Sequence, residues 1–405
     1  MRVCHVTTFY PPYHFGGDAI LTQAMCEALA RNGHDVTVVH SVDAYRLHGT
    51  TVPAETPDPP NLRRIALESA LGPLSLMAIQ QSGRPMLLRR RLAEVLADDY
   101  DVVHFHNVSL VGGPGVLSMS HAPVTLYTPH DHWLICNTHV LWKDGRQPCD
   151  ARTCVRCALR SGIPPQLWRL GRFTTQQLEH VDLILSPSAF TAQQLRGAGI
   201  SRPIAVLPSF TASVLLPPPV RPLPPNAPLL YAGRLVRSKG IEALLAAIAP
   251  RRDLRLRVVG DGPLLPALRA QYASAAHITF AGPVTHDAMR EEYAHARAVI
   301  VPSWGPEVFP LTVIEAMAAG TPVIVRRAGG SDEAVERTGG GLVYEHPDEL
   351  VPLIDGLLRD PALEVTLAEH ARQGVAQHFS ESRWLCDYLA QIERVRAARA
   401  TGALT

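Results

Sequence analysis

Short runs of β-branched and apolar residues alternate with longer segments of helical periodicity along almost the entire chain. This alternation is typical of βαβ units, in which parallel strands form a sheet that helices cover on both faces. We expect strands at residues 2–7, 35–40, 101–105, 124–128 and 182–186, then at 229–232, 256–259, 277–280, 298–301 and 322–325. Helices are expected between them, including residues 21–32, and at 380–399. The predicted fold class is α/β.

The two sets of strands are separated by a segment with seven prolines, Leu215–Pro228. Because proline removes backbone donors and favours stiff, extended chain, this segment is predicted to be a linker. A chain of 405 residues also exceeds what one core usually serves. The predicted parts are an N-terminal Rossmann-like domain (1–212) with a cysteine-rich insertion (131–160), the linker (213–227), a C-terminal Rossmann-like domain (228–380) facing the first across a cleft, and a C-terminal helix (381–405) packing back on the N-terminal domain.

The charge and hydropathy of the chain exclude some classes of function. The formal net charge is +1, so we expect no nucleic-acid partner, and any phosphate must be bound locally. The first apolar run, Met1–Thr8, is too short for a signal peptide, and no stretch is as long as a membrane span, so we expect a cytoplasmic protein. Arg84–Leu92 is both cationic and apolar, which fits either a solvated helix face or a peripheral contact with the inner membrane face.

The run Tyr231–Gly240 carries the first signal of chemistry. It reads as a strand that enters a Gly233-Arg234 turn and reaches Lys239 just before a helix. A guanidinium, an ammonium and free helical N–H groups would then meet at the carboxyl end of a strand, where α/β sheets bind anions. A diphosphate fits this site, and the alternative is a surface turn with two solvated cations.

Two acids eight positions apart, Glu307 and Glu315, form the second signal. Glu315 falls in an otherwise apolar helix, where an ionised carboxylate is costly unless it meets a donor. Ligand hydroxyls could supply such donors. The alternative is a helix cap by Glu307 and an exposed Glu315.

Together with Gly260-Asp-Gly262 and Phe280–Val284, these motifs are arranged as in one known family. The ordered set resembles the retaining GT-B glycosyltransferases of family four, also called glycosyl transferases group 1. An early glycine pair, Gly16-Gly17, and the run Val102–Asn107 extend the resemblance over nearly the whole chain. It implies a GT-B fold with two Rossmann-like domains.

The resemblance also implies roles for individual residues. Arg234 and Lys239 would bind the donor diphosphate, Glu315 the ribose hydroxyls, and Glu307 the transferred sugar near the reacting carbon. His130, rather than His132, would face the donor sugar. The remaining donor-binding positions are glycines and backbone groups of the turns, namely Gly16, Gly17, Gly233, Gly282 and Val284. His104 and His106 could line the acceptor side or could simply pack.

One position departs from the family pattern, because Pro310 stands where many relatives have glycine and so removes one backbone donor. The expected function is retaining transfer of a sugar from a nucleotide diphosphate sugar, such as a UDP- or GDP-sugar, to a hydroxyl acceptor. No metal is required for such transfer. The alternatives are a nucleotide-sugar epimerase and a non-catalytic nucleotide-sugar binding protein.

Four cysteines, Cys136, Cys149, Cys154 and Cys157, lie in the polar segment after His130. Four thiolates ending in Cys-x2-Cys can enclose one tetrahedral zinc ion that orders a loop. The sequence therefore predicts a structural zinc site. An iron–sulfur cluster, disulfides and unmetallated thiols are the alternatives.

Overall fold

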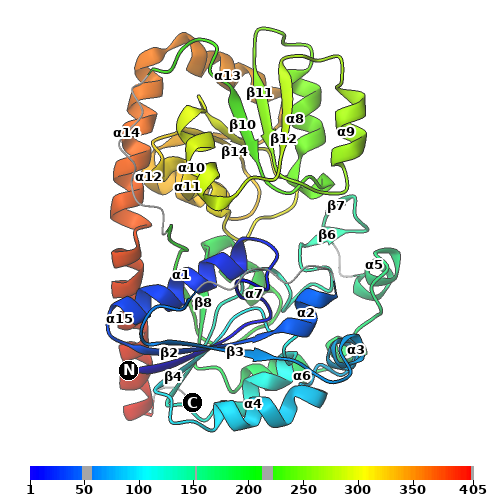
Figure 1. The fold of residues 1–405 in the computed structure, drawn as a ribbon, viewed down its shortest axis with the longest axis vertical. Coiled ribbons are helices and arrows are strands. Elements are labelled where there is room, and N and C mark those ends of the chain that lie inside the picture. The colour runs from blue at the N-terminus through cyan, green and yellow to red at the C-terminus, as the bar shows by residue number, and fades with distance from the viewer. Residues whose placement is uncertain (48–56, 151–152, 212–221, 403–405) are drawn as a thin grey trace. The chain divides into compact units, whose positions relative to one another are not determined.

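A computed structural model describes residues 1–47, 57–150, 153–211 and 222–402. The chain divides into two compact units. Unit 1 holds residues 1–139, 153–208 and 384–405, and unit 2 holds residues 140–152 and 209–383. Each unit is an α/β structure with its own sheet and core (Figure 1).

The sheet of unit 1 has seven parallel strands in the order β3-β2-β1-β4-β5-β8-β9. The strands are β1 (Arg2–Val6), β2 (Asp35–Ser41), β3 (Leu62–Leu67), β4 (Val102–Phe105), β5 (Val124–Tyr127), β8 (Leu183–Ser186) and β9 (Ile204–Val206). The helical segments are α1 (Gly17–Arg31), α2 (Val42–Arg46), α3 (Pro73–Ser82), η1 (Met86–Leu88), α4 (Arg89–Leu96), η2 (Pro114–Met119), α5 (Cys154–Arg160), η3 (Leu167–Leu170), α6 (Phe173–Leu178), α7 (Ala189–Gly197) and α15 (Glu381–Ala400). The strand order reverses between β1 and β4, which makes the sheet doubly wound.

The sheet of unit 2 has six parallel strands in the order β12-β11-β10-β13-β14-β15. The strands are β10 (Leu229–Ala232), β11 (Leu256–Val259), β12 (Ile278–Gly282), β13 (Val299–Val301), β14 (Val323–Arg326) and β15 (Gly341–Tyr344). The helical segments are η4 (Arg237–Lys239), α8 (Ile241–Ile248), α9 (Leu265–Gln271), α10 (His286–His295), α11 (Leu311–Ala318), α12 (Glu333–Thr338), η5 (Pro347–Glu349), α13 (Leu350–Arg359) and α14 (Pro361–His378). Here the order reverses between β10 and β13.

Every strand expected from the sequence is confirmed to within two residues at each end. Buried parallel strands read as continuous apolar runs, which is why the signal is clear. Three further strands of these two sheets, β3, β9 and β15, were not expected. The apolar run of β3 is interrupted by two arginines, β9 has three residues, and β15 begins with glycine. None of the three is therefore a long apolar run.

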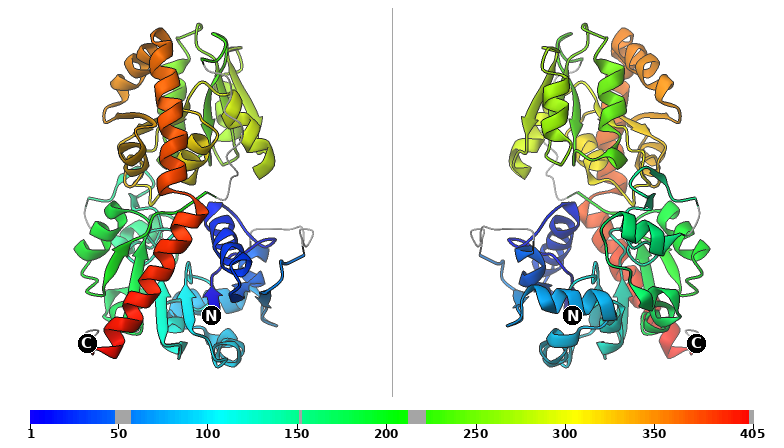
Figure 2. Two further views of the ribbon diagram at one scale, coloured as in Figure 1. Left: turned by 90° about the vertical axis from the view of Figure 1, so that its left-hand side faces the viewer. Right: turned by 90° about the vertical axis from the view of Figure 1, so that its right-hand side faces the viewer.

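Helix α15 belongs to unit 1 from Trp384 onward and packs against its sheet (Figure 2). Trp384, Tyr388 and Ile392 are buried. Arg399 forms an ion pair with Asp182 at 2.8 Å, directly before β8. The C-terminal helix therefore completes the N-terminal unit.

Two predicted parts differ from the observed units. Within the cysteine-rich insertion, residues 140–150, with the hairpin β6 (Trp142–Lys143) and β7 (Gln147–Pro148), cluster with unit 2. Trp142 is buried, and its ring lies where a side chain added at Gly305 of the same unit would meet it. The predicted linker lies mostly outside the described residues, since its residues 213–221 are not among them.

None of the described helices is both long and apolar enough to cross a membrane.

Candidate functional site

The carboxyl edge of the unit 2 sheet brings together residues from two neighbouring strands at the point where the strand order reverses. β10 leads into Gly233 and Arg234, and β13 leads into Pro302 and Ser303. Ligands of open α/β sheets bind at this switch point, outside the carboxyl ends of the strands. A site is thus expected here on topology alone.

Lys239 and Glu307 form an ion pair at this edge. The Lys239 ammonium donates to both carboxylate oxygens of Glu307, at 2.7 and 2.8 Å. Ser303 Oγ donates to Glu307 Oε1 at 2.6 Å. The carboxylate is mostly buried, with 14% of the Glu307 side chain exposed against 35% for Lys239. Two loops, one after β10 with Lys239 and one after β13 with Ser303 and Glu307, therefore place one cation and one anion at fixed positions.

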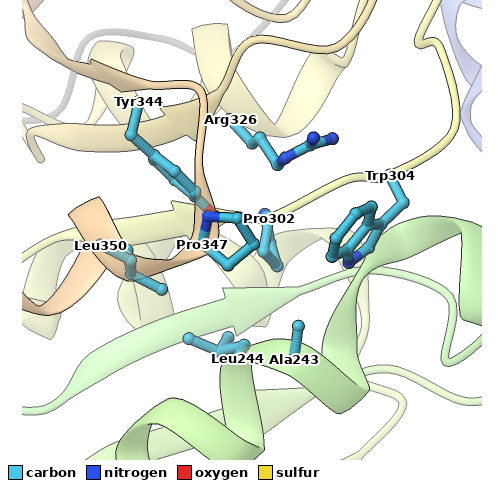
Figure 3. Close-up of a pocket in the computed structure, with 8 residues that line it drawn as sticks. All are labelled: Ala243, Leu244, Pro302, Trp304, Arg326, Tyr344, Pro347 and Leu350. Atoms are coloured by element: carbon cyan, nitrogen blue, oxygen red, sulfur yellow. The ribbon is translucent and has the colours of Figure 1, made fainter.

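The loop after β13 is bound tightly to the turn that carries Lys239. The backbone N–H groups of Trp304 and Gly305 both donate to Ser238 O at 2.8 Å. Arg326 lies over the Trp304 ring, 4.4 Å from its centroid, and closes a small apolar cavity behind the loop (Figure 3). This packing holds Ser303 and Lys239 in one rigid arrangement.

Glycines allow the backbone to approach closely around the ion pair. Gly240 has φ +72°, and a Cβ added there would lie 1.9 Å from Pro302 O. Gly329 has φ +74°, and its Cβ would lie 2.2 Å from Glu307 O. Neither position tolerates a side chain, because each combines left-handed backbone with contact to a main-chain atom.

We expect Gly329→Ala to destabilise the protein by about 2 kcal/mol or more and to lower turnover, because the added methyl group displaces the backbone of Glu307. Gly33→Ala is the matched control, since Gly33 has φ +79° but nothing within 4 Å of its added Cβ. It should cost about 1 kcal/mol, the backbone strain alone, and leave turnover unchanged. Urea unfolding and turnover of both variants test this. Equal losses in the two would contradict it.

Glu315 lies on α11 and accepts a hydrogen bond from the Tyr293 hydroxyl at 2.9 Å. Burial first, then the charge of Glu315 raises the pKa of Tyr293 well above its usual value, so the phenol remains a donor. Glu315 is half-buried. The helix begins after Pro310, which is its N-cap, so Glu307 does not cap it. The predicted capping alternative for Glu307 is therefore wrong.

The other predicted donor-binding residues of unit 2 lie around the same edge. Arg234 is exposed, and its carbonyl accepts from the Tyr231 hydroxyl at 3.0 Å. Gly233 and Gly260 have hydrogen-bonded backbones across β10–β12, because Gly233 N donates to Val259 O and Gly260 N donates to Gly282 O. Val284 follows Gly282 and is half-buried. Backbone turns of three adjacent strands thus meet here.

A cavity of about 50 Å³ lies beside the ion pair, lined by Gly233, Lys239, Ser303, Glu307 and Thr312 among others. It is too small for a whole nucleotide sugar, since pockets for such ligands have several hundred Å³. The cavity marks the floor of the candidate site rather than its full extent.

In unit 1, Gly16 and Gly17 are exposed at the start of α1, where Gly16 is the N-cap with φ 95°. The amides of the first helical turn are available to an anion at this point. Asp18 lies in the same turn, and burial followed by repulsion from Asp131 raises its pKa to about 6. The electrostatic potential at the start of α1 is therefore less positive than the free amides of the first helical turn alone would make it.

His130 ends a chain of three histidines that crosses the unit 1 sheet. His5 Nδ1 hydrogen-bonds to His106 Nε2 at 2.8 Å, and His106 Nδ1 hydrogen-bonds to His130 Nε2 at 2.9 Å. His104 bonds to Thr128 and Tyr388 at 2.8 and 3.1 Å. His104 and His106 are fully buried, so they do not line an acceptor surface, and the packing alternative is confirmed for both.

The chain of histidines determines which nitrogen of His130 carries a proton. If His5 Nδ1 donates to His106, then His106 Nδ1 donates to His130 Nε2, and His130 has its N–H on Nδ1. The opposite direction puts an N–H on His5 Nε2, a buried atom with no partner among the described residues. A buried donor without an acceptor is costly, which favours the first direction. Burial also lowers the pKa of His130 to about 4, so the ring is neutral near pH 7.

Among the described residues, His5, His104 and His106 form the single group of three or more His, Cys, Asp or Glu whose ligand atoms lie within 4.8 Å of one another. However, the 2.8 Å contact between His5 and His106 is a hydrogen bond. Nitrogens around a tetrahedral zinc ion lie about 3.3 Å apart for Zn–N bonds of about 2.0 Å. Hydrogen bonding, not metal binding, explains this cluster.

The four cysteines do not form such a group among the described residues. Cys136 lies 3.3 Å from the Thr138 hydroxyl, and Cys154 and Cys157 lie on α5. Cys149 belongs to unit 2, whereas Cys136, Cys154 and Cys157 belong to unit 1. The predicted zinc stays a prediction, which metal analysis of anaerobically purified protein decides.

The site contains two groups that the sequence analysis missed, Ser303 and Tyr293. Ser303 follows a buried strand at the switch point, which is a signal that strand order would have supplied. Tyr293 gives no sequence signal, because it lies on α10 and reaches Glu315 only through helix packing.

Both halves of the chain match known families of proteins. The profile described as Glycosyltransferase Family 4 matches residues 15–211, and the one described as Glycosyl transferases group 1 matches residues 227–360. An uncharacterized glycosyltransferase of Methanocaldococcus jannaschii is 24% identical over 94% of this chain and 95% of its own.

Solved structures with the same fold cover nearly the whole chain. The sucrose-phosphate synthase of Thermosynechococcus elongatus aligns with a TM-score of 0.76 and 24% identity over 98% of this chain and 99% of its own. HepE of Anabaena in complex with UDP aligns with a TM-score of 0.66 and 16% identity over 97% and 100%. Two doubly wound parallel-sheet units with these neighbours define a GT-B fold, that of a large class of glycosyltransferases.

The matches of both halves, in order, are to glycosyltransferases. The chain belongs to the glycosyl transferases group 1, and it is an enzyme that transfers glycosyl groups.

Proposed function

We propose that this glycosyltransferase moves a sugar from a nucleotide diphosphate sugar to a hydroxyl acceptor with retention of anomeric configuration. The observation that supports the proposal most is the Lys239–Glu307 pair, with Ser303, at the switch point of unit 2. It offers one compact cation for a leaving phosphate and one carboxylate for a sugar. HepE, a neighbour in fold, was solved with UDP bound.

In the proposed reaction, the bond between the sugar and the diphosphate breaks, and negative charge grows on the leaving oxygen. Lys239 and Arg234 stabilise that charge, together with the amides at the start of α8. Because the leaving group is stabilised by side chains, transfer requires no metal ion. A phosphate oxygen then helps to deprotonate the acceptor on the same face of the sugar, so no separate enzymic base is needed.

We assign the remaining residues by the same chemistry. Glu315 accepts hydrogen bonds from the ribose, and Glu307 contacts the transferred sugar. Neutral His130, with its N–H on Nδ1, donates to a sugar hydroxyl. Pro310 has no N–H to offer a phosphate, so the amides that follow it on α11 replace that contact.

The proposal is tested in two steps. A thermal-shift screen of UDP-, GDP- and other nucleotide sugars should identify the donor, and mass spectrometry with hydroxyl acceptors should then detect a glycosylated product. The anomeric configuration of that product, read by NMR, tests retention. Isomerised donor in the absence of any acceptor would favour an epimerase, and donor binding without turnover would favour a non-catalytic binding protein.

We expect Glu315→Gln to raise the Kd for the donor about tenfold, because two neutral hydrogen bonds replace charge-assisted ones. Turnover at saturating donor should stay within about twofold of wild type, since the ribose is remote from the bond that breaks. Tyr293→Phe, which removes the phenol that bonds to Glu315 but keeps the carboxylate, is the control and should change the Kd less. Calorimetric titration measures both. A loss of turnover without a change in Kd would reverse the assigned role.

A further inference from the structure

Unit 1 exposes a set of large apolar side chains on three neighbouring segments. On α3, Leu74 and Met77 are 61% and 58% exposed, although they occupy one face of a short helix. On η3, Leu167 and Leu170 are 66% and 68% exposed. The third segment is η1, where Met86 and Leu87 are each about half exposed, as is Leu71 just before α3. Surface helices usually direct such residues toward the core, so a cluster of them in solvent marks an interaction surface.

The segments α3, η1 and η3 lie next to one another and form one continuous surface, which we call a platform. α3 contacts both η1 and η3. Trp168, on η3, donates from Nε1 to Gln80 O of α3 at 2.8 Å. Arg84, just before η1, stacks over Phe173 with its guanidinium carbon 4.7 Å from the ring centroid. Figure 1 shows α3, α4 and α6 close together on this side of the unit. We call this platform the α3–η3 face.

The chain in and around these segments is strongly cationic. No acidic residue occurs between Ser69 and Ala93 or between Thr153 and Leu178, whereas these two stretches contain eight arginines. The whole chain has a net charge of only +1, so the positive charge is concentrated here. Arg84, Arg89, Arg90 and Arg91 are all exposed. Exposed apolar side chains and exposed arginines therefore lie on neighbouring segments of unit 1.

We propose that the α3–η3 face binds the surface of an anionic lipid bilayer. Leucine and methionine side chains insert at the boundary of head groups and acyl chains, while arginines remain at the phosphates. The eight arginines, with no acidic residue in the same two stretches, match the negative charge of a phospholipid surface, and this charge match favours lipid as the partner. The attachment is peripheral, since α3 has ten residues.

Co-sedimentation with vesicles tests the proposal with the full-length protein. Wild type should bind vesicles of phosphatidylcholine and phosphatidylglycerol in equal parts, bind those of phosphatidylcholine alone at least tenfold more weakly, and be released by high salt. Leu74→Ser with Met77→Ser should weaken binding at least tenfold. The triple change Arg89→Gln, Arg90→Gln and Arg91→Gln should do the same.

Two matched controls separate the face from general effects. Val206→Ser changes an exposed apolar residue on β9, and Arg31→Gln, Arg196→Gln and Arg359→Gln together remove the same charge elsewhere. Both should bind like wild type, and thermal melts should show that all variants fold. Binding unchanged in the Leu74 and Met77 variant, or no binding by wild type, overturns the proposal. Sedimentation velocity tests whether the face instead binds a second copy of the protein. If the wild type is a dimer and the Leu74 and Met77 variant is a monomer, the lipid proposal is also overturned.

The readout does not depend on sugar transfer. Failure of vesicle binding would leave the proposed reaction intact, and an inactive protein could still bind vesicles through this face.

Discussion

Lys239→Ala is expected to lower kcat/KM for sugar transfer by about a hundredfold or more, which corresponds to about 2.7 kcal/mol of transition-state stabilisation. Lys239 is the cation that can follow charge onto the leaving phosphate, and such contacts strengthen as the bond breaks. The chain has one other lysine, Lys143, which pairs with Asp150 on the β6–β7 hairpin. Lys143→Ala is therefore the matched control and should leave turnover unchanged.

A structural role for Lys239 can be separated from a catalytic one. The ammonium also neutralises Glu307, so its loss leaves a mostly buried carboxylate with Ser303 as its remaining side-chain donor among the described residues. Glu307→Gln removes that charge. If Lys239 only neutralises Glu307, the double variant should regain the activity of Glu307→Gln alone. We expect the double variant to stay at least as slow as Lys239→Ala, with Glu307→Gln alone slowing turnover rather than donor binding. Recovery in the double variant would end the leaving-group assignment.

Acid should destabilise the protein below about pH 6.5, the ordinary pKa of histidine. Burial lowers the pKa of His5 to about 3, of His40 to about 4 and of His130 to about 4. The unfolded chain therefore binds protons between pH 6.5 and about 4 that the folded protein excludes, and stability falls as the pH falls. Asp18 acts in the opposite direction, because its raised pKa of about 6 stabilises the fold at lower pH. Burial also lowers the pKa of His104 and of His106 well below the ordinary value of histidine. The five histidines together outweigh Asp18.

Each histidine contributes up to about 1.4 kcal/mol per pH unit in this window. We therefore expect a net loss of at least about 3 kcal/mol per unit between pH 6 and pH 5, measured by urea unfolding. His40→Phe should reduce this slope by the share of one histidine, since His40 stacks on Tyr10 and Tyr13 and phenylalanine keeps that packing. His121→Gln, at an exposed position, is the control and should not change the slope. Stability that stays flat from pH 7 to pH 5 would contradict the assignment of buried neutral histidines.

The sequence determined much of the fold, and for a physical reason. Central parallel strands are buried on both faces, so their apolar runs are unambiguous, and β10 and β11 were placed residue for residue. Edge strands carry a weaker pattern, because one side is open to solvent. β3 was missed for that reason, since Arg63 and Arg64 interrupt its apolar run. Turn glycines and isolated charges in apolar surroundings likewise predict Lys239, Glu307 and Glu315 as candidate site residues from the sequence alone.

Only the tertiary structure decided which of these groups meet. Lys239 and Glu307 are 68 positions apart and pair because β10 and β13 are neighbours in the sheet. His5, His106 and His130 form one chain because β1, β4 and β5 lie side by side, which turns three separate histidines into one hydrogen-bonded unit. The exposed apolar surface of α3 and η3 also needed the structure, because periodicity alone would have placed those residues inward. Strand order and helix packing are long-range properties, and a single sequence carries no local signal for them.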